Sequence, residues 1–425
     1  MLKQTRLNAR AMATAIAAIA LALTGLAVDS SGKAFAQTAD VVLENGTIFT
    51  VDAKDSVAEA LAIVDGMIVY VGKNAGAARW KGSTTRTVDL KGKMVLPGFV
   101  DSHSHVYLRA EAMFWVNLNG ARTLQQYKER TQAFLKRHPG AKQVRGVGFN
   151  LGFILKKVQE TGIPAYKLLD EVVGKDIPAV FLTNGHHQIW VNTRAMKNAA
   201  ITKDTPDPKG ATLDRNAKGE QIGIFREFAA QNLIIEKLPY PDFTVDQFKQ
   251  AVLSFQRNLA GPRGITSVRV PVHYPSMAYL NALNQLDDEN KLTLRQNLVL
   301  WANEHRDVSQ VSQLVRLSKE YRGTNYKVAG VKFFGTGVGR KSNLVWKQDL
   351  LNRTIAAVDK ERLQVFVHVV GPTSDYAAVL DAFEYAIRQN GKRDARHAIT
   401  HTHTPGSPLV ARFAKLGVWA DGHPP

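Results

Sequence analysis

Apolar residues in the second half of the chain fall into short β-branched runs separated by longer amphipathic stretches. From the second run to the sixth, the runs recur about every 30 to 36 residues, which is the length of one βαβ unit. The stretches between them have the apolar period of helices. The runs are MVLPGFVDSHSH at 94–105, GITSVRV from Gly264, LRQNLVLW from Leu294, VAGVKFF from Val328, LQVFVHVV from Leu363, HAITHTH from His397 and GVWADG from Gly417. The predicted helices are 276–289, 307–321, 348–360 and 374–390.

This alternation predicts an α/β fold with a parallel sheet that is buried on both faces, either a barrel or a doubly wound sheet. The number of runs favours a TIM-like (β/α)8 barrel over residues 96–425, in which seven strands are visible and the eighth is missing. Residues 121–263 interrupt the repeat after its first strand and are predicted to form a large insertion. They contain the strand-like segments QVRGVGF and PAVFLTN.

Short alternating runs before the barrel predict a separate small β unit over residues 37–95. Turn pairs separate these runs, at Asn45-Gly46, Asp65-Gly66 and Lys91-Gly92. Such pairs are typical of hairpins, so we expect a small antiparallel unit. It is too small to bury much apolar surface alone.

The first residues have the pattern of an export signal. Lys3, Arg6 and Arg10 precede an apolar run over 11–28, and Ala34-Phe35-Ala36 is a small-x-small cleavage site. Residues 1–36 are therefore predicted to be a cleaved signal peptide, which implies a periplasmic or secreted protein without stable membrane insertion. An uncleaved anchor is the alternative, because an 18-residue run is at the short edge of a membrane span.

The composition of the chain limits the partners and the metal ligands that we expect. The chain has 55 Lys and Arg against 37 Asp and Glu, a formal net charge of +18, no cysteine and 12 histidines. The basic residues are scattered and no zinc finger or aromatic-basic repeat is present, so nucleic-acid binding is not expected. Without cysteine, any metal site must use His, carboxylate or Lys ligands.

Histidines at the predicted strand ends point to a metal site. His103 and His105 are two apart, and two residues apart in a strand project from the same face. His368 and His401 end two further strands, and the carboxyl ends of parallel barrel strands meet at one mouth. Paired imidazoles there suit one or two divalent ions, with zinc the first expectation and Mn, Ni or Fe the alternatives. A buried, hydrogen-bonded packing role is the alternative for each histidine taken singly.

Lys332 is the unusual residue of the barrel pattern. It lies within VAGVKFF, where either face should be buried, and a buried ammonium is costly unless it is paired or neutral. A neutral amine can take up carbon dioxide to form a carbamate that bridges two metal ions. The alternative is a lysine at the strand end that extends to solvent.

Ions at this mouth would activate water and polarise a carbonyl, which predicts metal-assisted hydrolysis. The reaction needs a carboxylate to carry the water proton to the leaving group. The sequence shows none at a later strand end, because Asp421 falls too early in the repeat.

At these residues the sequence resembles the amidohydrolase superfamily, in particular the family 3 group of YtcJ-like proteins and N-substituted formamide deformylases. The resemblance implies a TIM-like barrel with a small β-sandwich, one or two metal ions, and hydrolysis of an amide-type C–N bond in a small N-acyl or N-formyl amine. The motifs that carry it are LPGFVDSHSH at 96–105, GHHQIWVN at 185–192, PDPKGATLDRNAKGEQIGIFRE at 206–227, GITSV at 264–268, VKFFGTG at 331–337, HVVG at 368–371 and RHAITH at 396–401.

The resemblance also implies residue roles. His103 and His105 look like the ligands of the first strand, and His368 and His401 like those of the fifth and sixth. Lys332 looks like the carboxylated bridging lysine. The segment with His187, Trp190 and Asn192 looks like part of the substrate pocket, with simple packing as the alternative for Trp190.

The chain departs from the family pattern at several places. Gly335-Thr336-Gly337 stands where Asp-Gly-Ser is usual, Gly371-Pro372 where Gly-Asp is usual, and Thr400 where Glu is usual. The family continues beyond Pro425 through an eighth strand whose Asp is the acid/base, so the catalytic carboxylate is expected there. The rival hypothesis is a truncated, non-catalytic metal-binding remnant of the family. The sequence does not determine the oligomeric state, and an oligomer is one alternative.

Overall fold

The computed structural model describes residues 26–28, 34–208, 210–239, 241–272, 276–338, 344–403 and 406–422. The chain divides into two compact units between Gly98 and Phe99, each of which is described by itself. Most of the predicted signal peptide lies outside the described residues. Within it, β1 (Leu26–Val28) pairs antiparallel with β2 (Ala34–Ala36). No helix in the described ranges is long and apolar enough to cross a bilayer.

The first unit consists of two small sheets. The predicted turns are present, since Asn45, Asp65 and Lys91 all have positive φ and each is followed by glycine. The expectation of a purely antiparallel unit is wrong, because β3 pairs parallel with β8 and β4 pairs parallel with β9. The four-stranded sheet has the order β7 (Met67–Gly72), β6 (Ala60–Val64), β3 (Val41–Glu44), β8 (Arg86–Asp89), and the three-stranded sheet has the order β5 (Val57–Ala58), β4 (Thr47–Phe49), β9 (Met94–Val95).

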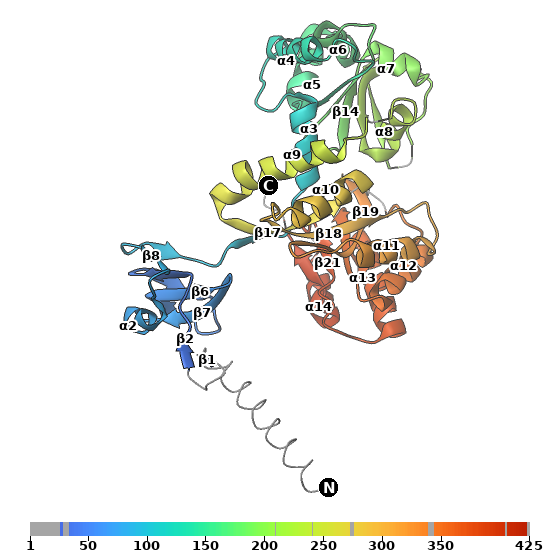
Figure 1. Cartoon of the computed structure of the whole chain (residues 1–425). Helices are drawn as coiled ribbons and strands as arrows, with labels where there is room; N and C mark the ends of the chain where they lie inside the picture. The colour runs from blue at the N-terminus through green and yellow to red at the C-terminus, as the bar shows by residue number, and fades with distance from the viewer. Residues whose placement is uncertain are drawn as a thin grey trace, which may run out of the picture. The chain divides into compact units, whose positions relative to one another are not determined.

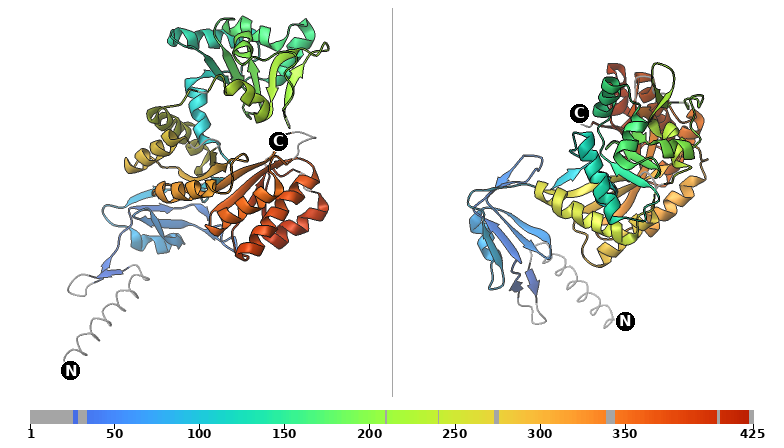
Figure 2. Two further views of the ribbon diagram at one scale, coloured as in Figure 1. Left: turned by 90° about the vertical axis from the view of Figure 1, so that its right-hand side faces the viewer. Right: turned by 90° about the horizontal axis from the view of Figure 1, so that it is seen from above.

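The second unit contains a curled, seven-stranded parallel sheet of the TIM-like α/β type. Each of the seven predicted runs contributes a strand, in sequence order, but the first run is divided, because its Met94–Val95 forms β9 of the first unit and only Phe99–Asp101 joins this sheet. Figure 1 and the left view of Figure 2 show its helices flanking the sheet. The strands are β10 (Phe99–Asp101), β17 (Ile265–Val272), β18 (Arg295–Ala302), β19 (Tyr326–Val338), β20 (Gln364–Val370), β21 (Ala398–Thr400) and β22 (Trp419–Asp421). The helices are α10 (Met277–Asp288), α11 (Gln310–Glu320), α12 (Gln348–Lys360), α13 (Thr373–Asn390) and α14 (Ser407–Leu416).

Alternation along the strands separates the two faces of this sheet. Val331 and Phe333 belong to the large apolar core that includes helix residues. Phe366 belongs to a small cluster with Val299 and Ala398. Lys332 lies between Val331 and Phe333, so it points to the face opposite the helices.

Residues between β10 and β17 form a lobe with its own six-stranded sheet, coloured cyan to yellow-green in Figure 1. Its strand order is β11 (Val116–Asn117), β12 (Val144–Val147), β13 (Ala179–Leu182), β14 (Gln188–Val191), β16 (Gln221–Arg226), β15 (Thr212–Arg215). Its helices are α3 (Arg109–Phe114), α4 (Leu124–Arg137), α5 (Leu151–Thr161), α6 (Ala165–Val173), α7 (Thr193–Asn198) and α8 (Glu227–Ile235). Helix α9 (Val245–Phe255) follows the lobe and packs in the barrel core through Phe248, Ala251 and Val252.

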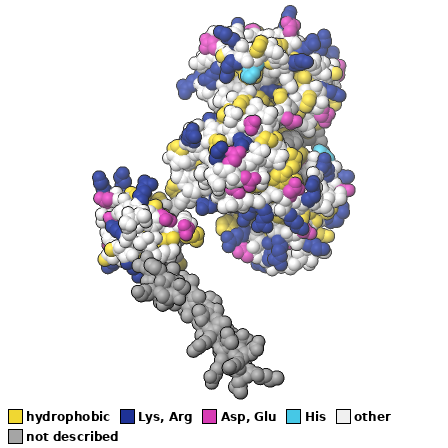
Figure 3. Space-filling model, viewed as in Figure 1, with side chains coloured by type: hydrophobic (Ala, Val, Ile, Leu, Met, Phe, Trp, Pro, Cys, Tyr) yellow, Lys and Arg dark blue, Asp and Glu magenta, His cyan; other side chains and the backbone are white. Residues whose placement is uncertain are grey.

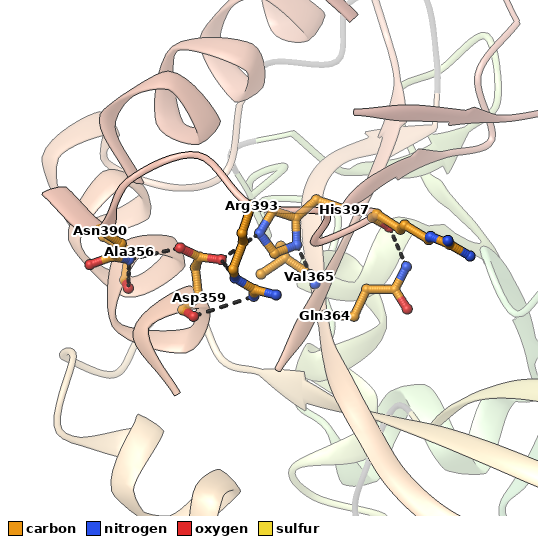
Figure 4. Close-up of polar contacts among 8 residues, drawn as sticks. Ala356, Asp359, Gln364, Val365, Asn390, Arg393 and His397 are labelled. Carbon is orange, nitrogen blue, oxygen red and sulfur yellow. Dashed lines mark hydrogen bonds and ion pairs between the residues drawn. The ribbon is translucent and has the colours of Figure 1, made fainter. Parts of the chain in front are cut away.

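A buried polar network joins the ends of α12 and α13 to the start of β21 (Figure 4). The Asp359 carboxylate is 4% exposed and lies 3.0 Å from His397 Nε2 and 2.9 Å from Arg393 Nε. Asn390 donates to its other oxygen at 2.8 Å. The backbone N–H of Val365 donates to His397 Nδ1 at 3.0 Å, so the proton of the neutral ring is on Nε2. This network fixes the amino ends of β20 and β21, the face where barrel residues serve stability.

On the face of the molecule drawn in Figure 3, charged side chains are not gathered in one patch. Lys and Arg side chains spread across the visible face in Figure 3, interspersed with Asp and Glu.

Candidate metal centre

The predicted metal ligands line one cavity at the carboxyl ends of the barrel strands. Its volume is about 390 Å³. The lobe between β10 and β17 supplies part of its wall. The lining residues are His103, His105, Leu108, Asn184, Gly185, His186, His187, Lys332, Phe334, His368, Val370, His401 and His403.

Neighbouring imidazoles in this cavity lie close together. The ring centroids of His103 and His105 are 5.1 Å apart, those of His103 and His401 are 4.7 Å apart, and those of His368 and His401 are 4.5 Å apart. Two imidazoles bound to one ion would have centroids about 5 Å apart, given metal–nitrogen distances of about 2.0–2.1 Å. Among the described residues, no three histidine or acidic side chains already form a ligand set around one point. Side-chain rotation would have to bring the ring nitrogens to a common ion, while the distances between neighbouring ring centroids are already close to those of bound imidazoles.

His103 and His105 reach the cavity for a different reason than the predicted one. Strand β10 ends at Asp101, so strand alternation does not orient the two rings, and that part of the prediction is wrong. Instead, the His103 N–H donates to the Asp101 carboxylate at 3.0 Å. His105 Nδ1 lies 3.1 Å from the Pro271 carbonyl, which can only accept, so Nδ1 carries the proton and Nε2 is left as the possible metal donor.

His368 and His401 come from adjacent strands. His368 is 3% exposed and lies in register with Thr400 across the β20–β21 ladder. His401 follows β21 and has φ of 62°. A left-handed conformation costs a non-glycine residue about 1 kcal/mol or more, and such residues cluster at functional sites.

Lys332 is completely enclosed by the barrel. It is 1% exposed, and its Nζ donates a 2.7 Å hydrogen bond to Thr400 Oγ1. Burial lowers the pKa of Lys332 to about 7, opposed by the Asp421 carboxylate and assisted by the Arg269 charge. The alternative in which this lysine extends to solvent is therefore excluded.

Two histidine–carboxylate pairs from the lobe face the same cavity. His187 Nδ1 is hydrogen-bonded to Glu227 Oε2 at 3.0 Å, and the His187 ring is 5.8 Å from that of His368. His186 Nε2 lies 3.0 Å from Glu111 Oε2. Of these four residues, only His187 was predicted as a site residue. His186 and Glu227 belong to the GHHQIWVN and GIFRE motifs, so the sequence marked both residues. Neither motif indicates which distant residue each one contacts.

Two of the predicted substrate-contact residues lie elsewhere. Trp190 is fully buried in the lobe, where its Nε1 donates to the Ala165 carbonyl at 2.7 Å. Asn192 is also fully buried and caps α7 by accepting from the Ala195 N–H at 3.0 Å. Neither lines the cavity, so the packing alternative holds for Trp190, and only His187 of the three is placed to touch a substrate.

Asp421 lies closer to the site than the repeat count suggested. It ends β22, pairs in register with Thr400, and is held by a 3.1 Å hydrogen bond from Ser102 Oγ. Its Oδ2 is 3.9 Å from His103 Nδ1. A carboxylate therefore stands beside one of the predicted ligands.

A curled parallel sheet, with four imidazoles and a buried lysine lining one cavity at the carboxyl ends of its strands, defines a TIM-like α/β protein with a candidate metal centre. The chain belongs to the amidohydrolase family, specifically family 3, whose model matches residues 86–425. This confirms the resemblance found in the sequence motifs.

Individual relatives agree with this assignment. The chain is 30% identical over 405 residues to the exoenzymes regulatory protein AepA of Pectobacterium carotovorum subsp. carotovorum, covering 91% of this chain and 84% of that protein. It is 28% identical over 218 residues to an N-substituted formamide deformylase of Arthrobacter pascens, covering 51% of this chain and 39% of that enzyme. An uncharacterized metal-dependent hydrolase from Pyrococcus horikoshii OT3 shares the fold, with a TM-score of 0.64 and 22% identity over 89% of this chain and 74% of that one.

Proposed function

We propose that this protein is an exported, metal-dependent amidohydrolase that cleaves the C–N bond of a small N-acyl or N-formyl amine. The observation that carries the proposal is the convergence of His103, His105, His368 and His401 with the buried Lys332 on one cavity. The partial similarity to an N-substituted formamide deformylase supports the choice of bond.

The donor set fits a divalent metal centre. His103, His105, His368 and His401 would hold the ion or ions, with zinc as the first choice and Mn, Ni or Fe as alternatives. The buried amine of Lys332 could add to carbon dioxide, forming an N–C bond with loss of one proton, and the resulting carbamate would link two ions. A bound divalent ion would supply Lewis acidity toward water and the amide carbonyl.

The remaining chemistry falls to groups of the chain. Hydrolysis adds the elements of water across the amide: oxygen bonds to the carbonyl carbon, the C–N bond breaks, and nitrogen gains a proton. We assign Asp421 the role of holding that proton between water and the leaving amine, because it lies beside His103. His187, oriented by Glu227, would bind the substrate from the lobe side of the cavity. A family-type Asp beyond Pro425 stays a prediction.

Metal analysis combined with an activity assay tests this function. Purified protein is supplied with Zn²⁺ or Mn²⁺ and assayed on N-formyl and N-acetyl amines, and its metal content is measured after dialysis. We expect at least one ion per chain and release of the free amine. Bound metal without turnover on any amide would leave the metal-binding remnant as the function, and absence of both would refute the metal centre.

Export is a separate part of the proposal. It rests on Lys3, Arg6 and Arg10, on the apolar run after them, and on Ala34-Phe35-Ala36. Cell fractionation followed by mass measurement of the intact chain tests it. We expect a product outside the cytoplasm that begins near Gln37; a full-length cytoplasmic product would contradict it.

A further inference from the structure

Two more cavities open next to the metal centre. Their volumes are about 290 Å³ and 200 Å³, and both are lined by Phe228, Glu304, His305 and Phe334. Phe334 also lines the metal cavity, where its ring centroid is 5.4 Å from that of His368. The two cavities therefore lie one aromatic ring away from the predicted reaction site.

Aromatic side chains form the walls of these cavities. The rings of Phe228 and Phe334 meet edge to face, with centroids 5.4 Å apart and an interplanar angle of 74°. Trp301, near the carboxyl end of β18, lines the larger cavity. Faces of aromatic rings carry partial negative charge, so they favour cations as well as apolar groups.

A single buried carboxylate oxygen faces both cavities. The Glu304 side chain is 19% exposed, and in the part of the chain that the structure describes its Oε2 is buried without a hydrogen-bond partner. Its Oε1 is 3.7 Å from Nε2 of His305, whose side chain is 82% exposed. Burial raises the pKa of Glu304, opposed by its own backbone N–H and by His305. The Oε2 atom of this carboxylate therefore lacks a donor, which a bound ligand can provide.

The charged residues that line the two cavities indicate whether the ligand is a cation or an anion. Glu236 lines the larger cavity and Glu227 the smaller one, and neither cavity has Lys or Arg among its described lining residues. This is unusual in a chain of net charge +18. An anionic group would be repelled here, while a cation gains both the carboxylate and the aromatic faces.

We infer that these cavities bind an ammonium or quaternary ammonium group of the substrate, held by Glu304 against Phe228 and Phe334. The inference deepens the proposed function and rests on it for the reaction: the substrate is an N-acyl or N-formyl amine that carries a second, cationic nitrogen. The amide lies at the metal cavity, and the cationic end passes Phe334 into the adjoining space.

A binding experiment tests the cation site without relying on activity. The full chain is titrated calorimetrically with choline and with its uncharged isostere 3,3-dimethylbutan-1-ol. We expect choline to bind about tenfold more tightly, the scale of one desolvated cation–aromatic contact with a carboxylate partner. Glu304→Gln should remove this preference and Phe228→Leu should reduce it, while Glu220→Gln, at an exposed carboxylate bonded to Asn216, should keep it. Equal affinities in the wild type, or an unchanged preference in Glu304→Gln, would overturn the inference.

A kinetic experiment separates this inference from the proposed function. Two N-acetyl alkylamines are compared, one ending in trimethylammonium and the other in tert-butyl. We expect the ratio of their kcat/KM values to favour the cation and to fall about tenfold in Glu304→Gln. Hydrolysis of both at equal kcat/KM would refute the cation site and leave the amidohydrolase intact. Hydrolysis of neither, without bound metal, would refute the function, and the choline titration would still decide the cation site.

Discussion

Lys332 and Thr400 meet across the interior of the sheet, with the lysine Nζ donating to the threonine hydroxyl at 2.7 Å. The two residues belong to β19 and β21, which are separated by β20. The partner is a neutral hydroxyl at a position where the family pattern has a carboxylate. Burial and the neutral hydrogen-bond partner disfavour the charged amine and outweigh the opposing Asp421 carboxylate, so this buried lysine is suited to react as a free base.

The carbamate hypothesis predicts a change in metal stoichiometry. We expect Lys332→Ala to lose one of two bound ions, because the bridging anion is gone, and reconstitution without bicarbonate to weaken the same ion in the wild type. Elemental analysis after dialysis measures both effects. Lys327→Ala, on an exposed position of the same strand, is the matched control. Identical stoichiometry in Lys332→Ala and the control would rule out the bridge.

If the clustered histidines bind the metal, replacing one of them should lower the metal affinity. His401→Asn should weaken metal binding by more than the roughly 10- to 100-fold typical of losing an outer partner of a ligand. Competition with a chromogenic chelator measures the affinity. His138→Asn changes an exposed histidine in the lobe and should leave the affinity as it is. Equal affinities of the two variants would remove His401 from the ligand set.

Asp421 is predicted to act on turnover rather than on metal content. Asp421→Asn should keep the bound metal and lower kcat by about 10²- to 10⁴-fold, the usual contribution of a positioned acid or base. Amine release under saturating substrate measures this loss. Asp176→Asn, at an exposed carboxylate, controls for general charge effects. A wild-type kcat in Asp421→Asn would show that another group carries the proton.

The Asp359 network predicts a specific acid sensitivity of the fold. Burial would raise the pKa of Asp359, but hydrogen bonds from His397 and Asn390 and the Arg393 charge outweigh it and lower the pKa to about 2. Because the folded-state pKa is depressed, the stabilisation is complete above the unfolded value near 3.8 and is lost as pH falls toward 2.

Denaturant unfolding at several pH values tests this sensitivity. The free energy of unfolding should fall by about 2 kcal/mol between pH 5 and pH 2 on account of Asp359. Asp359→Asn should remove that dependence and should destabilise the protein at neutral pH by about 3 kcal/mol, since it leaves buried cationic and donor groups unpaired. Asp394→Asn, whose carboxylate pairs with Arg396 at the surface, should retain the wild-type pH profile.

The barrel strands and the meeting of His103, His105, His368 and His401 at one cavity could be predicted because the information is local. Runs such as VAGVKFF show by their own pattern that they are buried strands, and a parallel sheet brings the carboxyl ends of its strands together. The proximity of His186 and Glu111 could not be found in this way, because the two residues are far apart in sequence and only His186 lies in the predicted insertion. The position of Asp421 was misjudged because the repeat count assumed even spacing. Helix α14, of 10 residues, makes the last unit shorter than the others.

The parallel pairings in the first unit were missed for a related reason. Turn pairs indicate hairpins between neighbouring strands, and these are present between β6 and β7. The return of β8 beside β3 is set by a longer connection through α2 (Asn74–Ala77), which carries no register information in the sequence.

Three non-glycine residues around the metal cavity, His186, Glu227 and His401, share positive φ values of 60 to 66°. A backbone in that conformation disfavours most replacement side chains before any contact with a ligand is considered. Attempts to retarget the enzyme by mutation should therefore leave these three positions unchanged and vary the ordinary backbone of the aromatic walls instead. Libraries built on Phe228 and Trp301 would vary the proposed cation site while the backbone around the candidate metal centre stays intact.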